Sequence, residues 1–155
     1  MLSRNNEYFE NLRKIGEAYE TIRKAHEDKK AELIGKFGYD SDEMKAWYEK
    51  KKEMTYPVPA GACKAYRAWM HSIEREADEV EMDDFLWDRE VKDFVEALRG
   101  AGIESFVYTN ASTALMDNIH DLEANGWKMT GLAEIRNTSR WATEEFTRGL
   151  RFEAR

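Results

Sequence analysis

The sequence predicts an α+β protein, with a long N-terminal helical hairpin in residues 1–56 followed by a compact α/β domain in residues 57–155. Between residues 85 and 135 the apolar positions change from a helical period to a strand period and back, which indicates helix, strand, helix, strand. Residues 4–35 instead form a polar stretch with one narrow apolar stripe. We expect the second region to form a small three-stranded mixed sheet with helices packed on one face.

The apolar stripe of the first region has the spacing of a coiled-coil seam. Its members, separated alternately by four and three residues, are Tyr8, Leu12, Ile15, Tyr19 and Ile22. The same register continues onto His26 and Lys29, so the seam weakens in its last turns. A second helix over residues 41–54, capped by Asp40 or Ser41, offers a partner face of Met44, Trp47, Tyr48, Lys51 and Met54. We expect a hairpin within one chain, and a homodimer through the first helix is the alternative.

Pro57 and Pro59 are the only prolines of the chain, and they separate the hairpin from the domain. A helix over residues 60–79 follows them. The next helix begins behind an Asp88 cap and ends at Gly100 and Gly102.

Three strands are predicted in the α/β domain. Residues 103–108 form the first, and a helix over residues 112–125 joins it to a second strand over residues 127–135, so these two should be parallel. The second strand should place Trp127, Met129, Gly131, Ala133 and Ile135 on one face. Residues 146–153 should return antiparallel, with Phe146, Leu150 and Phe152 on one side.

The net charge of −7 lies entirely in residues 57–155, which hold 12 Lys and Arg against 19 Asp and Glu. The densest acidic run gives seven candidate partner-binding residues: Glu74, Glu76, Asp78, Glu79, Glu81, Asp83 and Asp84. Such a field repels nucleic acid and favours a basic protein partner. The five tryptophans are expected mostly in the core. The hairpin aromatics Tyr8, Tyr19, Trp47 and Tyr48 are further interface candidates, because a thin element buries them less easily.

The turn at residues 109–113 is the strongest candidate for a small ligand. It follows a strand and opens a helix, where free amides and the helix dipole favour an anion such as phosphate. The candidate residues are Thr109, Asn110, Ser112, Thr113 and His120, the last as an acid or base paired with Asp117. Plain capping of the helix by Asn110 or Ser112 is the competing interpretation.

No catalytic, metal or cofactor pattern is present in the residues. The single cysteine, Cys63, has no partner at metal-binding spacing, and the histidines lie in no metal motif. No enzyme activity, cofactor or metal is therefore predicted. The apolar runs are too short to cross a membrane, and the N-terminus has no apolar secretory region, so the expected location is the cytoplasm of a bacterial host.

The C-terminal half resembles a known group of proteins. The shared segments are FLWD, EVKDFVEALRGAGI, SFVYTNASTAL and NGWKMTGLAEI, within residues 85–135. They are similar to those of small, functionally undescribed proteins of phages and other mobile elements of gut Firmicutes. The resemblance implies a setting in which small acidic proteins often inhibit host defence, as anti-CRISPR proteins do by occupying the nucleic-acid channel of a Cas effector.

These observations predict a non-enzymatic, protein-binding inhibitor that blocks a basic nucleic-acid-binding host protein, such as a Cas-type effector. It would bind neither nucleic acid nor membrane, and would be a monomer or a homodimer. A phosphate-binding or enzymatic module at residues 109–113 and a purely structural coiled-coil homodimer are the alternatives.

Overall fold

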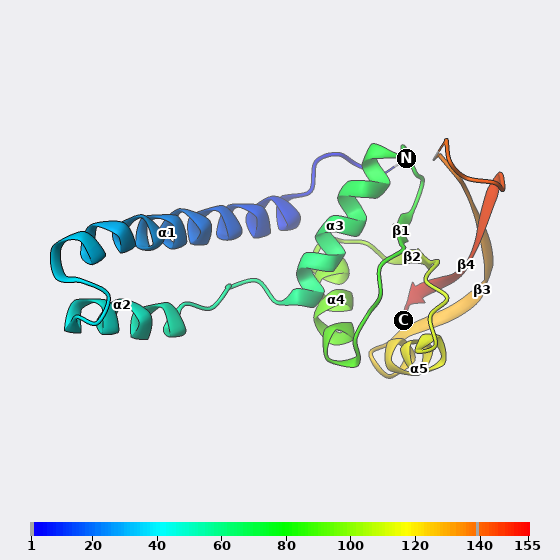
Figure 1. Cartoon of the computed structure of the whole chain (residues 1–155). Coiled ribbons are helices and arrows are strands. Elements are labelled where there is room, and N and C mark those ends of the chain that lie inside the picture. Colours follow the sequence, from blue (N-terminus) through cyan, green and yellow to red (C-terminus); the bar gives the residue numbers. More distant parts are fainter. Residues whose placement is uncertain (1, 139) are drawn as a thin grey trace. The chain divides into compact units, whose positions relative to one another are not determined.

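The computed structural model describes residues 2–138 and 140–155, which divide into two compact units. The hairpin unit is Glu10–Val58, and the sheet unit combines residues 2–9 with Pro59–Arg155. The elements in chain order are α1 (Glu7–Phe37), α2 (Asp42–Glu53), α3 (Ala60–Glu74), β1 (Val80–Met82), α4 (Asp88–Gly100), β2 (Ser105–Tyr108), α5 (Leu115–Ala124), β3 (Trp127–Arg136) and β4 (Phe146–Ala154) (Figure 1). The α+β class is confirmed. None of the described helices combines the length and the apolar character needed to cross a bilayer.

The sheet has four strands in the order β1-β2-β4-β3, one more than predicted (Figure 1). The additional strand is β1, which pairs in parallel with β2 and was missed because its three residues lie inside the acidic run. β4 is antiparallel to both β2 and β3, as expected for the returning strand. β2 and β3 consequently run in the same direction, but β4 lies between them.

A register shift between Met129 and Gly131 changes the faces of β3. Met129 lies opposite Phe152 and Leu132 lies opposite Leu150, so Met129 and Leu132 share a face. The predicted alternation, with Gly131 on the face of Met129, is therefore wrong beyond the shift. One extra residue in a strand exchanges every later side chain between faces.

The core of the sheet unit lies between the sheet and α4. The buried ring of Phe106 on β2 lies 5.3 Å from Phe94 of α4, 5.4 Å from Trp127 and 5.4 Å from Phe152. The side-chain amide of Asn118 on α5 donates to the hydroxyl of Tyr108, which lies on the same face of β2 as Phe106, at 3.0 Å. α4 and α5 thus cover one face of the sheet, as predicted.

Several predicted helix ends move. α3 ends at Glu74 rather than near residue 79, because Glu76 adopts a positive φ of 56°. The N-cap of α4 is Trp87 and not Asp88, and the Trp87 amide donates to the Glu90 carboxylate at 3.1 Å. α4 ends as predicted, since Gly102 has a φ of 73° and the Ile103 amide donates to the Leu98 carbonyl at 2.9 Å.

The first residues of the chain belong to the sheet unit. Phe9 is fully buried, with its ring 5.0 Å from Trp69 and 5.9 Å from Tyr66 of α3. The side-chain amide of Asn6 donates to the carbonyl of Ala101 at 2.9 Å. The start of α1 is therefore fixed by core packing of this unit and not by the seam.

In the hairpin unit α1 and α2 meet through His26 and Trp47. Their rings stack at 4.6 Å with an interplanar angle of 5°, and Trp47 Nε1 donates to the His26 carbonyl oxygen at 2.7 Å. His26 is only 8% exposed, whereas the predicted seam residues Ile15 and Ile22 are 45% and 60% exposed. The predicted seam is therefore not buried at Ile15 and Ile22, whereas His26, which was expected with Lys29 to weaken it, is buried against a partner within the chain. Ser41 caps α2 as predicted, accepting from the Met44 amide at 3.2 Å.

Opposite effects are predicted for two Gly→Ala substitutions, one at the crossing of α3 and α4 and one on α1. A Cβ at Gly61 would overlap the Glu90 carbonyl oxygen and lie 2.7 Å from the Phe94 nitrogen, so Gly61→Ala should destabilise the sheet unit by about 1–3 kcal/mol. Gly35→Ala, at a helical position with no atom within 4 Å, should stabilise α1 by about 0.5–1 kcal/mol. Chemical denaturation followed by circular dichroism checks both. A Gly61→Ala protein as stable as wild type would contradict the close approach.

Candidate functional site

Residues Glu74–Asp84, the acidic segment, form the turn from α3 into β1 and the start of the loop after it. Buried Ser72 fixes this turn, because its hydroxyl donates to the Ala68 carbonyl at 2.6 Å and accepts from the Glu81 amide at 2.8 Å. The Ala77 amide donates to the Ser72 carbonyl at 2.9 Å. The acidic segment is therefore held by α3 and the sheet.

Lys and Arg side chains pair with several carboxylates of the acidic segment. Glu79 pairs with Arg151 at 2.8 Å, and Glu81 with Arg75 at 3.2 Å. Looser ion pairs join Asp83 to Arg75 at 3.9 Å and Asp84 to Lys64 at 4.0 Å. These contacts neutralise part of the field that the sequence predicts, and they commit Glu79 and Glu81 to the fold.

Glu81 is the most buried acid of the segment, with a side chain 13% exposed. Burial raises the pKa of its carboxyl, and the charge of Arg75 lowers that pKa in part. The ion pair with Arg75 therefore offsets a desolvation cost and does not create an accessible binding charge.

Glu74, Glu76 and Asp78 are the exposed carboxylates at the turn itself. Glu76 and Asp78 also line a groove of about 390 Å³ between the acidic segment and the β3–β4 hairpin. Val107 and Ile135 contribute apolar atoms to this groove, on the face of the sheet opposite Phe106. The turn is thus the part of the predicted acidic surface that a partner can reach.

The hairpin aromatics differ in their accessibility. Trp47 is 4% exposed and is occupied by its contact with His26. Tyr19 is half-buried, edge-on to Tyr56 at 5.1 Å, and Tyr8 is half-buried in the sheet unit beside Phe9. Tyr48, at 44% exposed, is the one of the four predicted interface rings with a large accessible surface. Its role in binding stays a prediction.

The predicted phosphate turn is bound to β1. The Thr109 amide donates to the Met82 carbonyl at 2.9 Å, and the Asn110 side-chain amide donates to the Asp83 carbonyl at 3.0 Å. α5 begins at Leu115 with Ala114 as its N-cap and no side-chain cap, so the prediction of capping by Asn110 or Ser112 is wrong. Asn110 Oδ1 and Ser112 Oγ are buried without a hydrogen-bond partner in the described structure. An amide oxygen is an acceptor and gives no attraction to a phosphate.

His120 lies apart from that turn. With Asp117, Asp121, Asp88 and Trp87 it lines an open pocket of about 540 Å³ between α5 and the residues that precede α4. Thr109, Asn110, Ser112 and Thr113 do not line this pocket. The structure therefore does not bring the predicted phosphate residues and His120 to one site, and the ligand-binding alternative stays a prediction.

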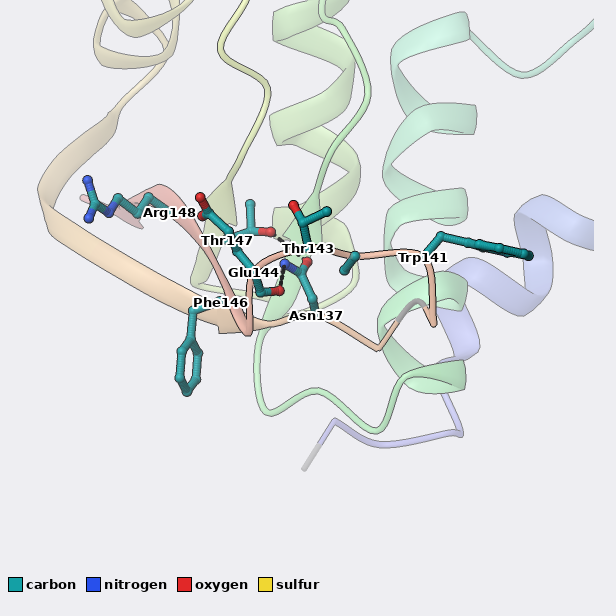
Figure 2. A pocket seen from close by; sticks show the side chains of 8 residues that line it. Asn137, Trp141, Thr143, Glu144, Phe146, Thr147 and Arg148 are labelled. Carbon is teal, nitrogen blue, oxygen red and sulfur yellow. Dashed lines mark hydrogen bonds between the residues drawn. The ribbon is translucent and has the colours of Figure 1, made fainter.

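One accessible region that the sequence analysis did not single out is the loop between β3 and β4. Asn137 closes it, donating to the Glu144 carbonyl at 2.9 Å and accepting from the Thr147 hydroxyl at 2.6 Å (Figure 2). The loop borders a pocket of about 530 Å³, and Figure 2 shows Trp141 and Phe146 pointing away from the polar cluster around Asn137. Trp141 is 81% exposed, so the expectation that it packs in the core is wrong.

Metal binding receives no support in the part of the chain that the structure describes. No group of three or more His, Cys, Asp and Glu side chains is placed to hold an ion there. Burial raises the pKa of the Cys63 thiol, which disfavours the thiolate form that binds metals.

A family model described as a domain of unknown function (DUF7698) matches residues 64–154, which is more than half of the chain. The matched stretch begins within α3 and reaches the last residue of β4, so it lies within the sheet unit. No curated protein and no solved structure is significantly similar to the chain. Membership of an uncharacterised family is thus confirmed, while the phage origin stays a prediction.

The pair of Arg75 and Glu81 predicts a pH-dependent loss of stability in Arg75→Gln. Because the folded-state pKa of Glu81 is raised, its ionised form costs stability at neutral pH, and that cost is relieved as pH falls through the raised pKa. Removing Arg75 raises this pKa further. The variant should lose about 1–3 kcal/mol at pH 7.5 and less at pH 4.5.

Denaturant unfolding at the two pH values measures this difference. Adding Glu81→Gln to Arg75→Gln should restore part of the stability at pH 7.5, because no buried carboxylate then lacks a cation. Arg67→Gln, an exposed change on the same helix, is the matched control and should behave as wild type. Equal losses at both pH values would show that the charge of Glu81 is not the cause.

Proposed function

This chain belongs to the family described as a domain of unknown function (DUF7698). From the surface of the chain itself, we propose that it is a non-enzymatic protein that binds a basic partner protein. The observation that carries the proposal is the exposed carboxylate group of Glu74, Glu76 and Asp78 on a turn held by the core. Residues 57–126, which contain this turn, hold 15 Asp and Glu against six Lys and Arg. A fixed group of like charges favours a surface of opposite sign.

The finer proposal is that the partner is a nucleic-acid-binding protein of a bacterial host, of the Cas effector type, and that binding blocks its basic channel. Carboxylates on a rigid turn offer such a channel the charge that phosphates otherwise provide. The resemblance to proteins of mobile elements supports this choice of partner. Tyr48 of the hairpin unit is the aromatic residue that we expect to add a contact, since its ring is accessible.

Neutralising the turn should weaken binding without disturbing the fold. The triple variant Glu74→Gln, Glu76→Asn, Asp78→Asn leaves the ion-paired Glu79 and Glu81 in place, and Asn suits the positive φ of residue 76. Binding to a purified Cas9-type effector, with and without guide RNA, should weaken by about tenfold or more for this variant. Wild-type affinity should also fall with added salt.

A second triple variant, Glu27→Gln, Asp28→Asn, Glu43→Gln, provides the matched control. It removes three exposed charges from the hairpin unit and therefore changes the net charge equally. We expect this control to bind as wild type does. Equal loss in both variants would assign the effect to net charge alone, and equal binding by wild type and the turn variant would remove the turn from the interface.

A further inference from the structure

The distal half of the β3–β4 hairpin is a two-stranded ribbon. β2 pairs with β4 only from Leu150 to Glu153, whereas β3 remains paired with β4 out to Arg136 and Phe146. In the described structure, residues 133–136 and 146–149 therefore have no third strand beside them. A two-stranded ribbon is marginally stable by itself in water, and a further strand would stabilise it.

The outer edge of β3 is open along this ribbon. β3 is an edge strand of ten residues, and an edge of that length presents unpaired backbone N–H and C=O groups to another chain. Lys128 and the register shift before Gly131 protect its first part, because a charge and a bulge both oppose strand pairing. Residues 131–136 are the accessible portion.

Apolar side chains lie exposed on one face of the ribbon. Leu132 is 83% exposed and lies opposite Leu150, and Phe146, on the same face of β4, is 44% exposed. Figure 2 shows Phe146 pointing away from the polar groups that close the loop. These side chains form a small apolar surface next to the open edge.

The charge of this region is opposite to that of the rest of the domain. Residues 127–155 hold six Lys and Arg against four Asp and Glu, whereas residues 57–126 have a large acidic excess. Arg151 is committed to Glu79, but Arg136 and Arg148 are exposed on the ribbon. By the strand register they share the face of Leu132 and Phe146 with one exposed carboxylate, Glu134, which lies opposite Arg148, so cations exceed carboxylates there by two to one. The ribbon therefore complements an acidic segment with some apolar side chains.

We propose that the edge of β3 at residues 131–136 binds an extended, acidic peptide segment of a partner protein as an additional strand. Leu132 and Phe146 contact its apolar side chains, and Arg136 and Arg148 its carboxylates. A peptide backbone satisfies the open N–H and C=O groups of the edge, which a nucleic-acid backbone does not. Nucleic acid is also repelled by the acidic residues before β3. Two copies of this chain, paired through β3, would bring ribbons of the same net charge together.

The test uses the full-length protein and a fluorescein-labelled, end-capped eight-residue peptide of alternating Glu and Val. Fluorescence anisotropy should show saturable binding of this peptide, with affinity weaker by about tenfold or more when every Glu is replaced by Lys. Amide hydrogen exchange should slow in residues 131–136 on binding, because strand addition protects those amides. A twelve-nucleotide single-stranded DNA of mixed sequence should not compete.

Two variants and one control assign the contact. Leu132→Asp and Arg136→Glu should each weaken binding of the Glu–Val peptide by about tenfold, while Met116→Asp on α5, also at an exposed apolar residue, should not. Unchanged far-ultraviolet circular dichroism and melting temperature establish that each variant is folded. Equal affinity for the Glu and Lys peptides, unchanged exchange in β3, or tighter binding of the DNA would each overturn the proposal. A wild-type dimer in sedimentation that Leu132→Asp dissociates would overturn it too, because a second copy would then occupy β3.

Discussion

The close crossing of α3 and α4 at Gly61 is the constraint on which the sheet unit depends. Absence of a side chain at Gly61 lets α3 approach the backbone of α4 at Glu90. Glu90 is itself buried, pairs with Lys64 of α3 at 2.7 Å, and accepts from the Trp87 amide at the start of α4. One carboxylate thus joins the two helices and the N-terminus of one of them. Removing Lys64 would leave the buried Glu90 carboxylate without a cation, which is strongly destabilising for a buried charge.

The position of α3 in turn determines where the acidic segment lies. Ser72 and Arg75, near the C-terminal end of α3, hold Glu81 on β1 through its amide and its carboxylate. Ion pairs at exposed sites contribute little to stability, but these contacts lie between helix and sheet, where screening by water is weaker. The acids closest to the sheet therefore act in folding, whereas Glu74, Glu76 and Asp78 at the turn are exposed. The charge density in the sequence does not distinguish these two groups.

The sequence was sufficient where one pattern extends over a whole element. Val91, Phe94 and Leu98 are all buried, as the helical spacing of α4 predicts. β1 was missed because three residues are too few to show a strand period, and the shift in β3 has no pattern of its own in the sequence. The sign of the acidic surface was predictable, but its accessible part was not. Glu79 is neutralised by Arg151, which is 72 residues away in the chain. The two side chains lie close together because β2 pairs with both β1, which follows Glu79, and β4, which contains Arg151.

His26 shows how a polar residue in an apolar stripe can hold two helices together. A histidine in the register of a coiled-coil seam is expected to weaken that seam, because burying an imidazole without hydrogen-bond partners costs free energy. Here His26 Nε2 lies 3.1 Å from the Trp47 carbonyl oxygen, while the Trp47 indole donates to the His26 carbonyl. The ammonium group of Lys51 lies 5.3 Å from the Trp47 ring centroid, where the aromatic face attracts a cation. A coiled-coil dimer that used the face of His26 would have to break these contacts. A polar residue in a coiled-coil seam favours the helix pairing that provides its hydrogen-bond partners. In this chain Trp47 of α2 provides those partners for His26.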